Sequence, residues 1–345
     1  MRVAIVNDQQ VAAEALRRIV LSDNRHQVAW TAADGREAVL RCQRDLPDVV
    51  LMDLVMPVMN GAEATREIMR SAPCPVLVVT ATVVGNYALV CEALGHGAFD
   101  AVCTPVLGDR PPREAGAQLL AKLQTVRDVT AAPPRSALAL ESPALGRPAA
   151  VPPPRDRPPL VALGASTGGP QALECILAGW PADFPAAVVV VQHIARDFAP
   201  SLTQWLQQRA PLSVRVAREG ERPTRGVALV AATDDHLVLR GDGTLGYTAQ
   251  PRDNPFRPSV DVLFRSLAEH WTGPSVAALL TGIGRDGAAG LRLLRERGWH
   301  TIAQDRGTSV VYGMPQAAAE LGAAVRTLPL PEIAPHILAH LGRLA

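Results

Sequence analysis

The sequence predicts an α/β fold with two doubly wound domains, an N-terminal domain of five parallel strands and a C-terminal parallel-sheet domain that also contains an antiparallel hairpin. Two observations lead to this prediction. Short apolar runs alternate with amphipathic helical patterns along both halves of the chain, which is typical of successive βα units. A proline-rich stretch separates the halves, and 345 residues are enough for two hydrophobic cores.

The first half of the chain contains five apolar runs, each followed by a helical pattern. In chain order the runs are VAIV, QVAWTA, DVVLMD, PVLVVTA and FDAVCT. The helical segments after them are VAAEALRRIVL, GREAVLRCQRD, GAEATREIMRSA, NYALVCEALGHG and AGAQLLAKLQTV. Parallel strands need a crossover connection, usually a helix, so these units predict a parallel sheet with helices on both faces. We expect this domain to span residues 1–127.

A linker and a second βα domain follow. Nine prolines fall between Pro133 and Pro159, mixed with Ala, Arg and Ser, which predicts a semi-rigid, extended linker over residues 128–158. In residues 159–345 the runs PLVALG, AAVVVVQ, SVAALLTG and HTIAQD predict strands of a second parallel sheet. The segment 227–249 alternates around Gly-Asp-Gly, which predicts an antiparallel hairpin.

The composition favours a cytoplasmic protein with no nucleic-acid partner and no direct membrane insertion. The formal net charge is +1, and no apolar run approaches the roughly 18–20 residues of a membrane span. The five cysteines are scattered and none forms a Cys-x-x-Cys pair, so neither a disulfide framework nor a zinc site is indicated. The start MRVAIVND runs directly into a predicted strand and not into a signal-peptide pattern.

Polar residues end the predicted strands of the first domain. Ligands of open parallel sheets sit at the carboxyl ends of the strands. Asn7 and Asp8, then Asp53, Thr80 and Thr104 occupy these ends. Two aspartates at one edge suit Mg²⁺, which prefers a few carboxylates plus water and phosphate oxygens. Each aspartate taken alone could instead cap the helix that follows it.

The segment DVVLMDLVMPVMNGAEATREI resembles the response-regulator receiver domain, and the resemblance covers residues 1 to about 125. It implies that Asp53 accepts a phosphoryl group from a histidine kinase. It also implies that Asp8, Asp53 and the carbonyl of Val55 hold Mg²⁺, and that Thr80 and the residue at position 104 sense the phosphoryl oxygens.

Two positions depart from the receiver pattern. The family usually has two acids where this chain has Asn7-Asp8, and Lys-Pro where it has Thr104-Pro105. A threonine is too short and uncharged to replace the lysine ammonium in a charge-assisted contact with the phosphoryl group. We therefore expect a weakened coupling between phosphorylation and output.

The second domain opens with PLVALGASTGGPQALECIL, in which a predicted strand ends at Gly-Ala-Ser-Thr-Gly-Gly. On such a turn, Ser166 could be a nucleophile beside the free amides of a helix N-terminus. The same glycine-rich turn could bind a phosphate. The stretch lacks the Gly-x-Gly-x-x-Gly spacing of a dinucleotide loop and the Gly-Lys-Ser/Thr of a P-loop. The residues alone leave both readings open.

A nucleophilic serine needs a base and an orienting acid on the same sheet edge. His193 directly follows the run AAVVVVQ, which places it at a strand end. His236 lies in the predicted hairpin and could reach the site only if the hairpin folds over it, while the other histidines lie in or beside helical segments. Asp286 and Asp305 both follow strands, and the pattern favours Asp286 only slightly.

The motifs GASTGGPQAL, VVVQHI, RPSVDVLFRSLAEH, LLTGIGRDGAAGL and TIAQDRGTSVVYGMPQAA resemble the CheB family of chemoreceptor protein-glutamate methylesterases across the whole second domain. The resemblance implies that Ser166 is the nucleophile, His193 the base and Asp286 the orienting acid. It also implies that backbone amides near the serine stabilise the oxyanion. The donors expected from it are Thr167, Gly168 and Ile283, of which Ile283 replaces a common methionine.

The resemblance also implies an activity and its partners. The expected activity is phosphorylation-regulated hydrolysis of glutamate methyl esters, with glutamine deamidation, on methyl-accepting chemotaxis proteins. A CheA-type histidine kinase would act on the receiver, the esterase would need no cofactor, and the protein would be a monomer. The Val-Asn-Asp start and the Thr104-Pro105 pair resemble the WspF branch, which serves pathways that control cyclic di-GMP.

Two other classes of function compete with this expectation. A catalytically degenerate, receptor-binding adaptor is disfavoured by the intact set Ser166, His193 and Asp286. A nucleotide-binding regulator would need an acid about 20 residues after the glycine-rich loop. Asp183 is available there, so this alternative is disfavoured only by the missing glycine spacing.

Overall fold

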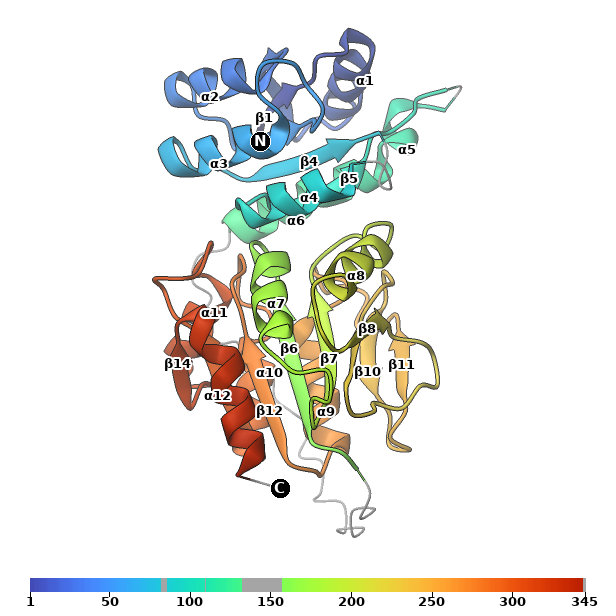
Figure 1. Ribbon diagram of the computed structural model, residues 1–345. Helices are drawn as coiled ribbons and strands as arrows, with labels where there is room; N and C mark the ends of the chain where they lie inside the picture. The colour runs from blue at the N-terminus through green and yellow to red at the C-terminus, as the bar shows by residue number, and fades with distance from the viewer. Residues whose placement is uncertain (82–85, 109, 132–156, 344–345) are drawn as a thin grey trace.

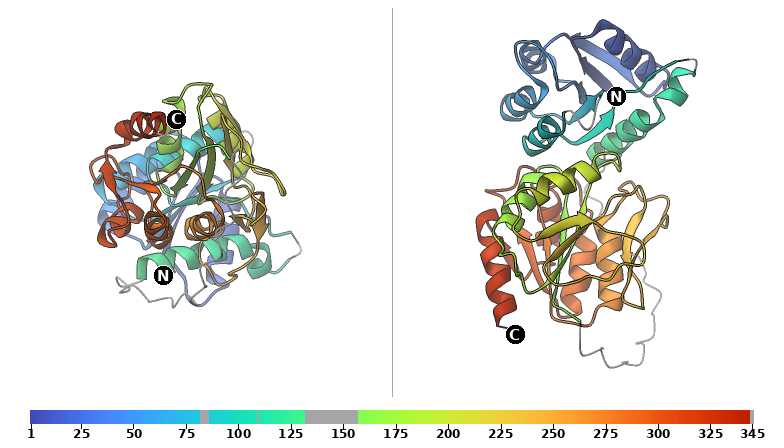
Figure 2. Two further views of the ribbon diagram at one scale, coloured as in Figure 1. Left: turned by 90° about the horizontal axis from the view of Figure 1, so that it is seen from below. Right: turned by 45° about the vertical axis from the view of Figure 1, so that its right-hand side comes forward.

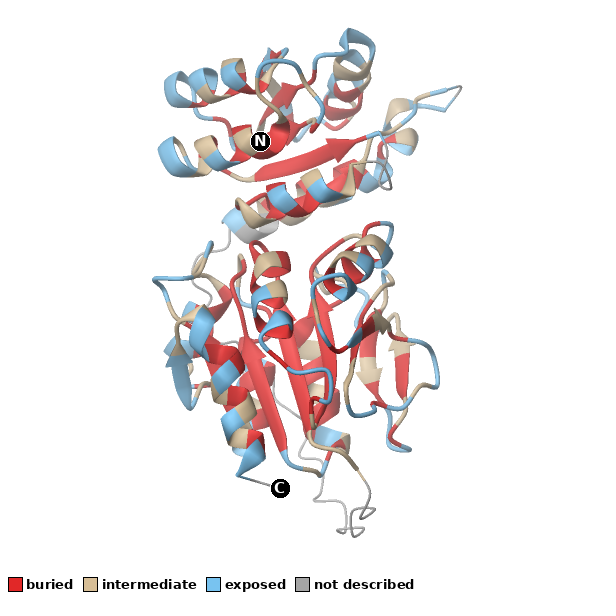
Figure 3. Cartoon of the chain, viewed as in Figure 1, coloured by how far each residue is buried: buried red, intermediate tan, exposed pale blue. Residues whose placement is uncertain are grey.

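Two parallel sheets, one in each half of the chain, form the framework of the protein (Figure 1). The computed structural model describes residues 1–81, 86–108, 110–131 and 157–343. The central strands of both sheets are buried between layers of helices (Figure 3). Within the described ranges no helix is both long and apolar enough to cross a membrane.

The N-terminal sheet has the order β2-β1-β3-β4-β5, and all neighbouring strands are parallel, as predicted. Its strands are β1 (Arg2–Val6), β2 (Gln27–Ala32), β3 (Val49–Met52), β4 (Val76–Thr80) and β5 (Asp100–Cys103). The helices are α1 (Gln10–Leu21), α2 (Gly35–Arg44), α3 (Gly61–Ser71), α4 (Tyr87–Gly95), α5 (Pro112–Ala115) and α6 (Ala117–Ala131). Asn60 and Glu63 form a capping box that fixes the start of α3, directly after the loop that carries Asp53.

The C-terminal sheet has seven parallel strands in the order β14-β13-β12-β6-β7-β9-β8. They are β6 (Leu160–Ala165), β7 (Ala187–Gln192), β8 (Ser213–Val216), β9 (Val227–Val230), β12 (Ser275–Leu279), β13 (His300–Gln304) and β14 (Arg326–Leu328). The helices are α7 (Gly169–Ala178), α8 (Ala199–Gln207), α9 (Val260–His270), α10 (Ala288–Glu296), α11 (Met314–Glu320) and α12 (Leu330–Gly342). The predicted hairpin is present as β10 (His236–Leu239) and β11 (Leu245–Thr248), on the side of the domain away from α12 (Figure 2).

The structure adds to the sequence prediction at three short strands. β8 and β14 form the two edges of the second sheet and were not expected. β9 lies within the segment 227–249 that we assigned to the hairpin, but it joins the parallel sheet between β7 and β8. The predicted domain boundary at residue 127 falls inside α6. Most of the predicted linker 128–158, namely residues 132–156, lies outside the described residues.

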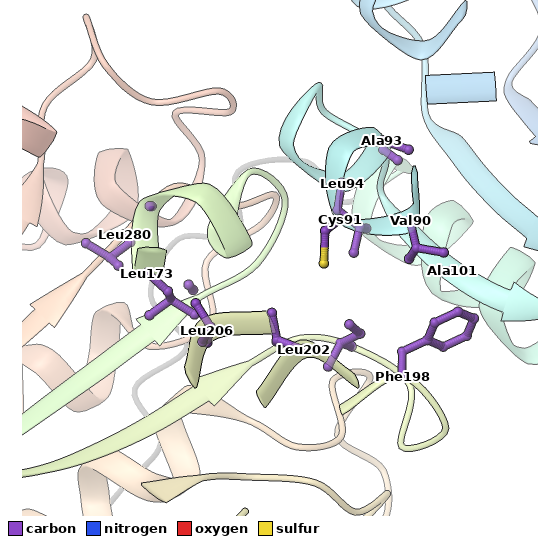
Figure 4. Packing of buried hydrophobic residues seen from close by; sticks show 14 of the residues in the cluster. Val90, Cys91, Ala93, Leu94, Ala101, Leu173, Phe198, Leu202, Leu206 and Leu280 are labelled. Carbon is purple, nitrogen blue, oxygen red and sulfur yellow. The ribbon is translucent and has the colours of Figure 1, made fainter. Parts of the chain in front are cut away.

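The two domains pack against each other through α4 of the first domain and α7 and α8 of the second. The carbonyl of Leu94 accepts a hydrogen bond of 3.1 Å from the amide of Gly168, and Gln171 Nε2 donates to the carbonyl of Cys91 at 2.9 Å. The carboxyl end of α4 therefore meets the amino end of α7, which is a favourable arrangement of helix dipoles. Apolar side chains from both domains join in one buried cluster (Figure 4). The residues labelled there are Val90, Cys91, Ala93, Leu94, Ala101, Leu173, Phe198, Leu202, Leu206 and Leu280.

Candidate active site

Ser166 lies at the carboxyl end of β6, on the turn that leads into α7. Its amide donates to the carbonyl of Thr281, which follows the neighbouring strand β12, at 3.0 Å. Gly168 has a φ of 77°, a left-handed conformation that glycine adopts without strain, so the chain can turn sharply before the helix. A Cβ atom on Gly282 would lie 2.6 Å from Cβ of Ser166, so only glycine permits this close approach. The predicted turn geometry around Ser166 is thus present.

His193 and Asp286 form a buried pair next to this turn. His193 Nε2 lies 2.7 Å from Asp286 Oδ2, and each residue is only 8% exposed. A carboxylate can only accept, so Nε2 carries the proton and Nδ1 is the basic nitrogen. Nδ1 is buried and has no hydrogen-bond partner in the part of the chain that the structure describes. Phe256 stacks on the imidazole with ring centroids 4.3 Å apart, which restricts the ring's orientation.

Asp286 is held as an anion at the amino end of α9. It accepts hydrogen bonds from Ser259 Oγ at 2.7 Å, from the Val260 amide at 2.6 Å and from the Asp261 amide at 3.2 Å. Burial alone would raise the pKa of Asp286, but the hydrogen bonds from His193, Ser259 and Val260 outweigh it and hold this pKa below its ordinary value. The carboxylate therefore stays ionised and can orient His193.

Asp261 mirrors this arrangement at the start of α10. Its Oδ1 accepts the Gly290 amide at 2.6 Å, while Asp286, which lies two residues before α10, caps α9. Burial, together with the charge of Asp286, raises the pKa of Asp261 to about 7. The two aspartates thus cap each other's helices and tie the α9 and α10 termini together.

Ser166 and His193 line one small cavity that the first domain covers. Its volume is about 30 Å³, far below the roughly 300 Å³ or more of a typical ligand pocket. The C-terminal domain contributes Ser166, His193, Ile194, Pro255, Phe256 and Arg257 to its wall. The first domain contributes Phe99, Asp100, Lys122 and Thr125, and Lys122 is paired with Asp100. In the described residues no hydrogen bond joins Ser166 Oγ to His193.

The three expected oxyanion donors differ in their surroundings. The Gly168 amide donates to the Leu94 carbonyl of the first domain, so it is occupied in this arrangement. Among the described residues, the amides of Thr167 and Ile283 have no acceptor. The side chain of Ile283 packs against the apolar core of the first domain, so this domain also touches the loop after β12.

Asp305, the alternative acid, is turned toward its own loop. Its Oδ1 accepts the Thr308 amide at 3.0 Å, which closes the turn after β13. The structure therefore brings Asp286, and not Asp305, to His193.

Sequence reasoning missed three residues that support the site. Gln192 donates to the carbonyls of Ser166 at 2.8 Å and His193 at 3.0 Å, which joins the two loops. Phe256 stacks on His193, and Ser259 binds Asp286. Gln192 directly precedes His193, and this adjacency is the one local signal that could have pointed to it.

In the first domain Asp53 follows β3 and is half-buried. Its Oδ2 accepts from Asn7 Nδ2 at 3.1 Å, and its Oδ1 accepts from the Leu54 amide at 2.7 Å. Burial raises the pKa of Asp53, and the nearby negative charge of Asp8 raises it further. That mutual repulsion is the setting in which a divalent cation binds, and the oxygen donors suit Mg²⁺. The backbone amide of Val55 opposes this rise in the pKa of Asp53.

Thr80 and Thr104 end the neighbouring strands β4 and β5. Thr80 Oγ1 accepts from Asn86 Nδ2 at 3.2 Å, and the Thr104 amide donates to the Thr80 carbonyl at 2.9 Å. Both residues thus lie at the sheet edge that carries Asp53. The order β1-β3-β4-β5 brings the predicted receiver residues to one edge.

The fold and the two sites define a class of protein, a receiver domain joined to a candidate serine hydrolase. Comparison with models of protein families supports this class for both domains. Residues 3–110 match the response regulator receiver domain, and residues 161–337 match the CheB methylesterase. The chain belongs to the CheB methylesterase family.

Curated relatives and a solved structure support the same assignment. The chain is 52% identical over 340 residues to protein-glutamate methylesterase/protein-glutamine glutaminase 1 of Burkholderia lata, covering 98% of this chain and 99% of the relative. It is 49% identical to protein-glutamate methylesterase/protein-glutamine glutaminase 2 of Pseudomonas syringae pv. syringae, covering 98% of each. The catalytic domain of CheB methylesterase from Thermotoga maritima matches 53% of this chain and 98% of its own, with 34% identity and a TM-score of 0.51. These relatives do not specify the WspF branch.

Proposed function

We propose that the protein is a protein-glutamate methylesterase that hydrolyses glutamate methyl esters on methyl-accepting chemoreceptors and deamidates selected glutamines there. The observation that carries this proposal is the buried His193–Asp286 pair beside the Ser166 turn. The names of the curated relatives supply the substrate class. We place the protein in the cytoplasm, where the modified receptor helices lie.

The proposed mechanism is acyl transfer through Ser166. His193 Nδ1 takes the proton of Ser166 Oγ as this oxygen attacks the side-chain carbonyl, and Asp286 stabilises the imidazolium that forms. The amides of Thr167 and Ile283 stabilise the oxyanion, with that of Gly168 once it is released. Methanol leaves with the proton from His193 when the substrate is an ester, and ammonia leaves when it is an amide. Water then hydrolyses the acyl-enzyme by the same route in reverse.

Released methanol and ammonia test this proposal together. Incubating the protein with a receptor that carries both methylated glutamates and glutamines at its modification sites should release both products. Release in neither the phosphorylated nor the unphosphorylated state would favour the receptor-binding adaptor instead.

The first domain is proposed to restrain the esterase. Its residues Phe99, Asp100, Lys122 and Thr125 line the cavity of about 30 Å³ at Ser166, and its Leu94 carbonyl accepts from the Gly168 amide. A receptor helix can reach Ser166 only if these contacts open. Phosphorylation would therefore act by favouring the open arrangement.

A fragment that starts near Arg157 should hydrolyse methyl esters faster than the unphosphorylated full chain. The expected gain is roughly 5- to 150-fold, the usual range of coupling between two sites. The fragment keeps its own sheet and core, and its solved relative is a catalytic domain alone. The measurement compares initial rates of methanol release at equal protein concentration. Equal rates would show that the domain contacts do not restrain catalysis.

We further propose that Asp53 accepts a phosphoryl group from a CheA-type kinase. Asp8, Asp53 and the Val55 carbonyl would hold Mg²⁺, which neutralises the charge of the transferred group. Thr80 and Thr104 would contact the phosphoryl oxygens. Asn7 weakens the proposed Mg²⁺ site, because its side chain is a neutral amide that donates to Asp53, whereas an acid at this position would add a carboxylate ligand for the ion.

The double variant Asn7→Asp, Thr104→Lys should be activated more strongly by phosphorylation than the wild type. The lysine adds a charge-assisted hydrogen bond to the phosphoryl group, worth about 1.5–3 kcal/mol, so activation should rise roughly tenfold or more. The measurement is the fold-activation of esterase activity by an acyl phosphate donor at one Mg²⁺ concentration. Wild-type activation as strong as that of the double variant would contradict this prediction. It would show that another cation, such as Arg110 in the loop after β5, already contacts the phosphoryl group.

A further inference from the structure

Behind Asp286 lies a second layer of hydrogen bonds that begins at His236. His236 is fully buried at the start of β10, where the hairpin packs against α9. Its Nδ1 lies 3.1 Å from the Ser259 amide, and its Nε2 lies 3.1 Å from the Pro251 carbonyl. Ser259 is the N-cap of α9 and donates its hydroxyl to Asp286 at 2.7 Å. A continuous chain of contacts thus runs from His236 through Ser259 and Asp286 to His193.

The two partners of His236 define its protonation. The Ser259 amide can only donate, so Nδ1 must be an unprotonated acceptor. The Pro251 carbonyl can only accept, so Nε2 must carry the proton. Both demands are met by one neutral tautomer. Burial lowers the pKa of His236, which agrees with a neutral ring.

We propose that His236 is a positioning residue for the esterase: by accepting the Ser259 amide it fixes the N-cap of α9, from which Ser259 and Val260 hold Asp286 against His193. His236 is absent from the cavity wall at Ser166, so it acts through Asp286 and not on substrate. The inference rests on the proposed function of Ser166, His193 and Asp286. A displaced N-cap would move Asp286 and misalign the base, because Asp286 takes most of its hydrogen bonds from that turn.

Two isosteric substitutions separate the two contacts of His236. In His236→Asn the amide oxygen can stand where Nδ1 stands, so the contact to Ser259 is kept and the contact to Pro251 is lost. In His236→Gln the amide nitrogen can stand where Nε2 stands, so the contact to Pro251 is kept and the contact to Ser259 is lost. Removing the outer-layer partner that orients a metal-binding histidine typically costs 10- to 100-fold in activity, and we take the same range for the layer behind Asp286. We expect roughly that loss of kcat in His236→Gln, with unchanged KM, and a kcat within about threefold of wild type in His236→Asn.

Ser266→Ala is the matched control for the hairpin. Ser266 Oγ accepts the Leu239 amide at 2.9 Å, so it joins the same hairpin to the same helix without touching Asp286. This variant should unfold at a lower temperature and keep the wild-type kcat in its folded form. Imidazole ¹⁵N resonances of His236 in the full-length protein should also show the neutral Nε2–H tautomer at pH 7.

The outcomes distinguish this inference from the proposed function. The assay is methanol release from a methylated receptor by the full chain. No release by the wild type would contradict the proposed function itself. An active wild type with His236→Gln as active as His236→Asn, or a charged or Nδ1–H ring at His236, would overturn only the positioning role.

Discussion

Ser166→Ala should abolish methyl ester hydrolysis and leave the protein folded. The expected loss is roughly 10⁴-fold or more, as is typical when the nucleophile of a serine hydrolase is removed. The hydroxyl has no hydrogen-bond partner among the described residues, so its removal should change the free energy of unfolding by less than about 0.5 kcal/mol. Methanol release measures the activity, and thermal unfolding measures the fold.

Ser201→Ala on α8 controls for the loss of a serine hydroxyl elsewhere in the domain. It should retain wild-type activity. A Ser166→Ala protein that keeps more than a few per cent of the wild-type rate would contradict the assignment of the nucleophile.

Asp286→Asn should lower kcat by on the order of 10³- to 10⁴-fold, whereas Asp305→Asn should change it less than about twofold. Asp286 Oδ2 accepts from His193 Nε2 at 2.7 Å, and a neutral amide neither stabilises the imidazolium nor enforces the tautomer that leaves Nδ1 basic. Among the described residues, the hydrogen bonds of the Asp305 side chain come from Thr308. The two substitutions make the same chemical change, and both aspartates follow strands of the same sheet. Asp305→Asn is therefore a matched control for Asp286→Asn.

The measurement is kcat for each variant in the fragment that starts near Arg157, so that domain closure does not limit the rate. A larger loss in Asp305→Asn than in Asp286→Asn would move the orienting acid to Asp305.

Much of the fold was predictable because parallel strands are buried on both faces. Such strands read as continuous apolar runs, as in Val188–Val191 of β7, and each is followed by a helical pattern. β8 and β14 escaped prediction because they are edge strands with exposed residues and no apolar run. β9 was assigned to the hairpin region because only its place in the sheet, between β7 and β8, separates it from β10.

The part of the candidate site that lies at the ends of strands was predictable from the sequence. Ser166 and His193 directly follow strands, so the topology alone brings them together. The choice between Asp286 and Asp305 depends on loop conformation, which no local pattern encodes. Phe256, Ser259 and His236 make their supporting contacts with residues that are distant in sequence, so no local pattern predicts these contacts. The contact between the domains at α4 had one signal in the sequence. The helix α4 is apolar on most sides, which is typical of a helix that is buried on more than one face.

Covalent labelling can show whether Ser166 is the nucleophile of the esterase. The fragment that starts near Arg157 is treated with a fluorophosphonate, the modified peptide is identified by mass spectrometry, and methanol release from a methylated receptor is measured at each extent of labelling. We expect one label per chain, on the peptide that carries Ser166, with methanol release falling in proportion to labelling. Labelling at another residue, or full methanol release after Ser166 is completely modified, would contradict it.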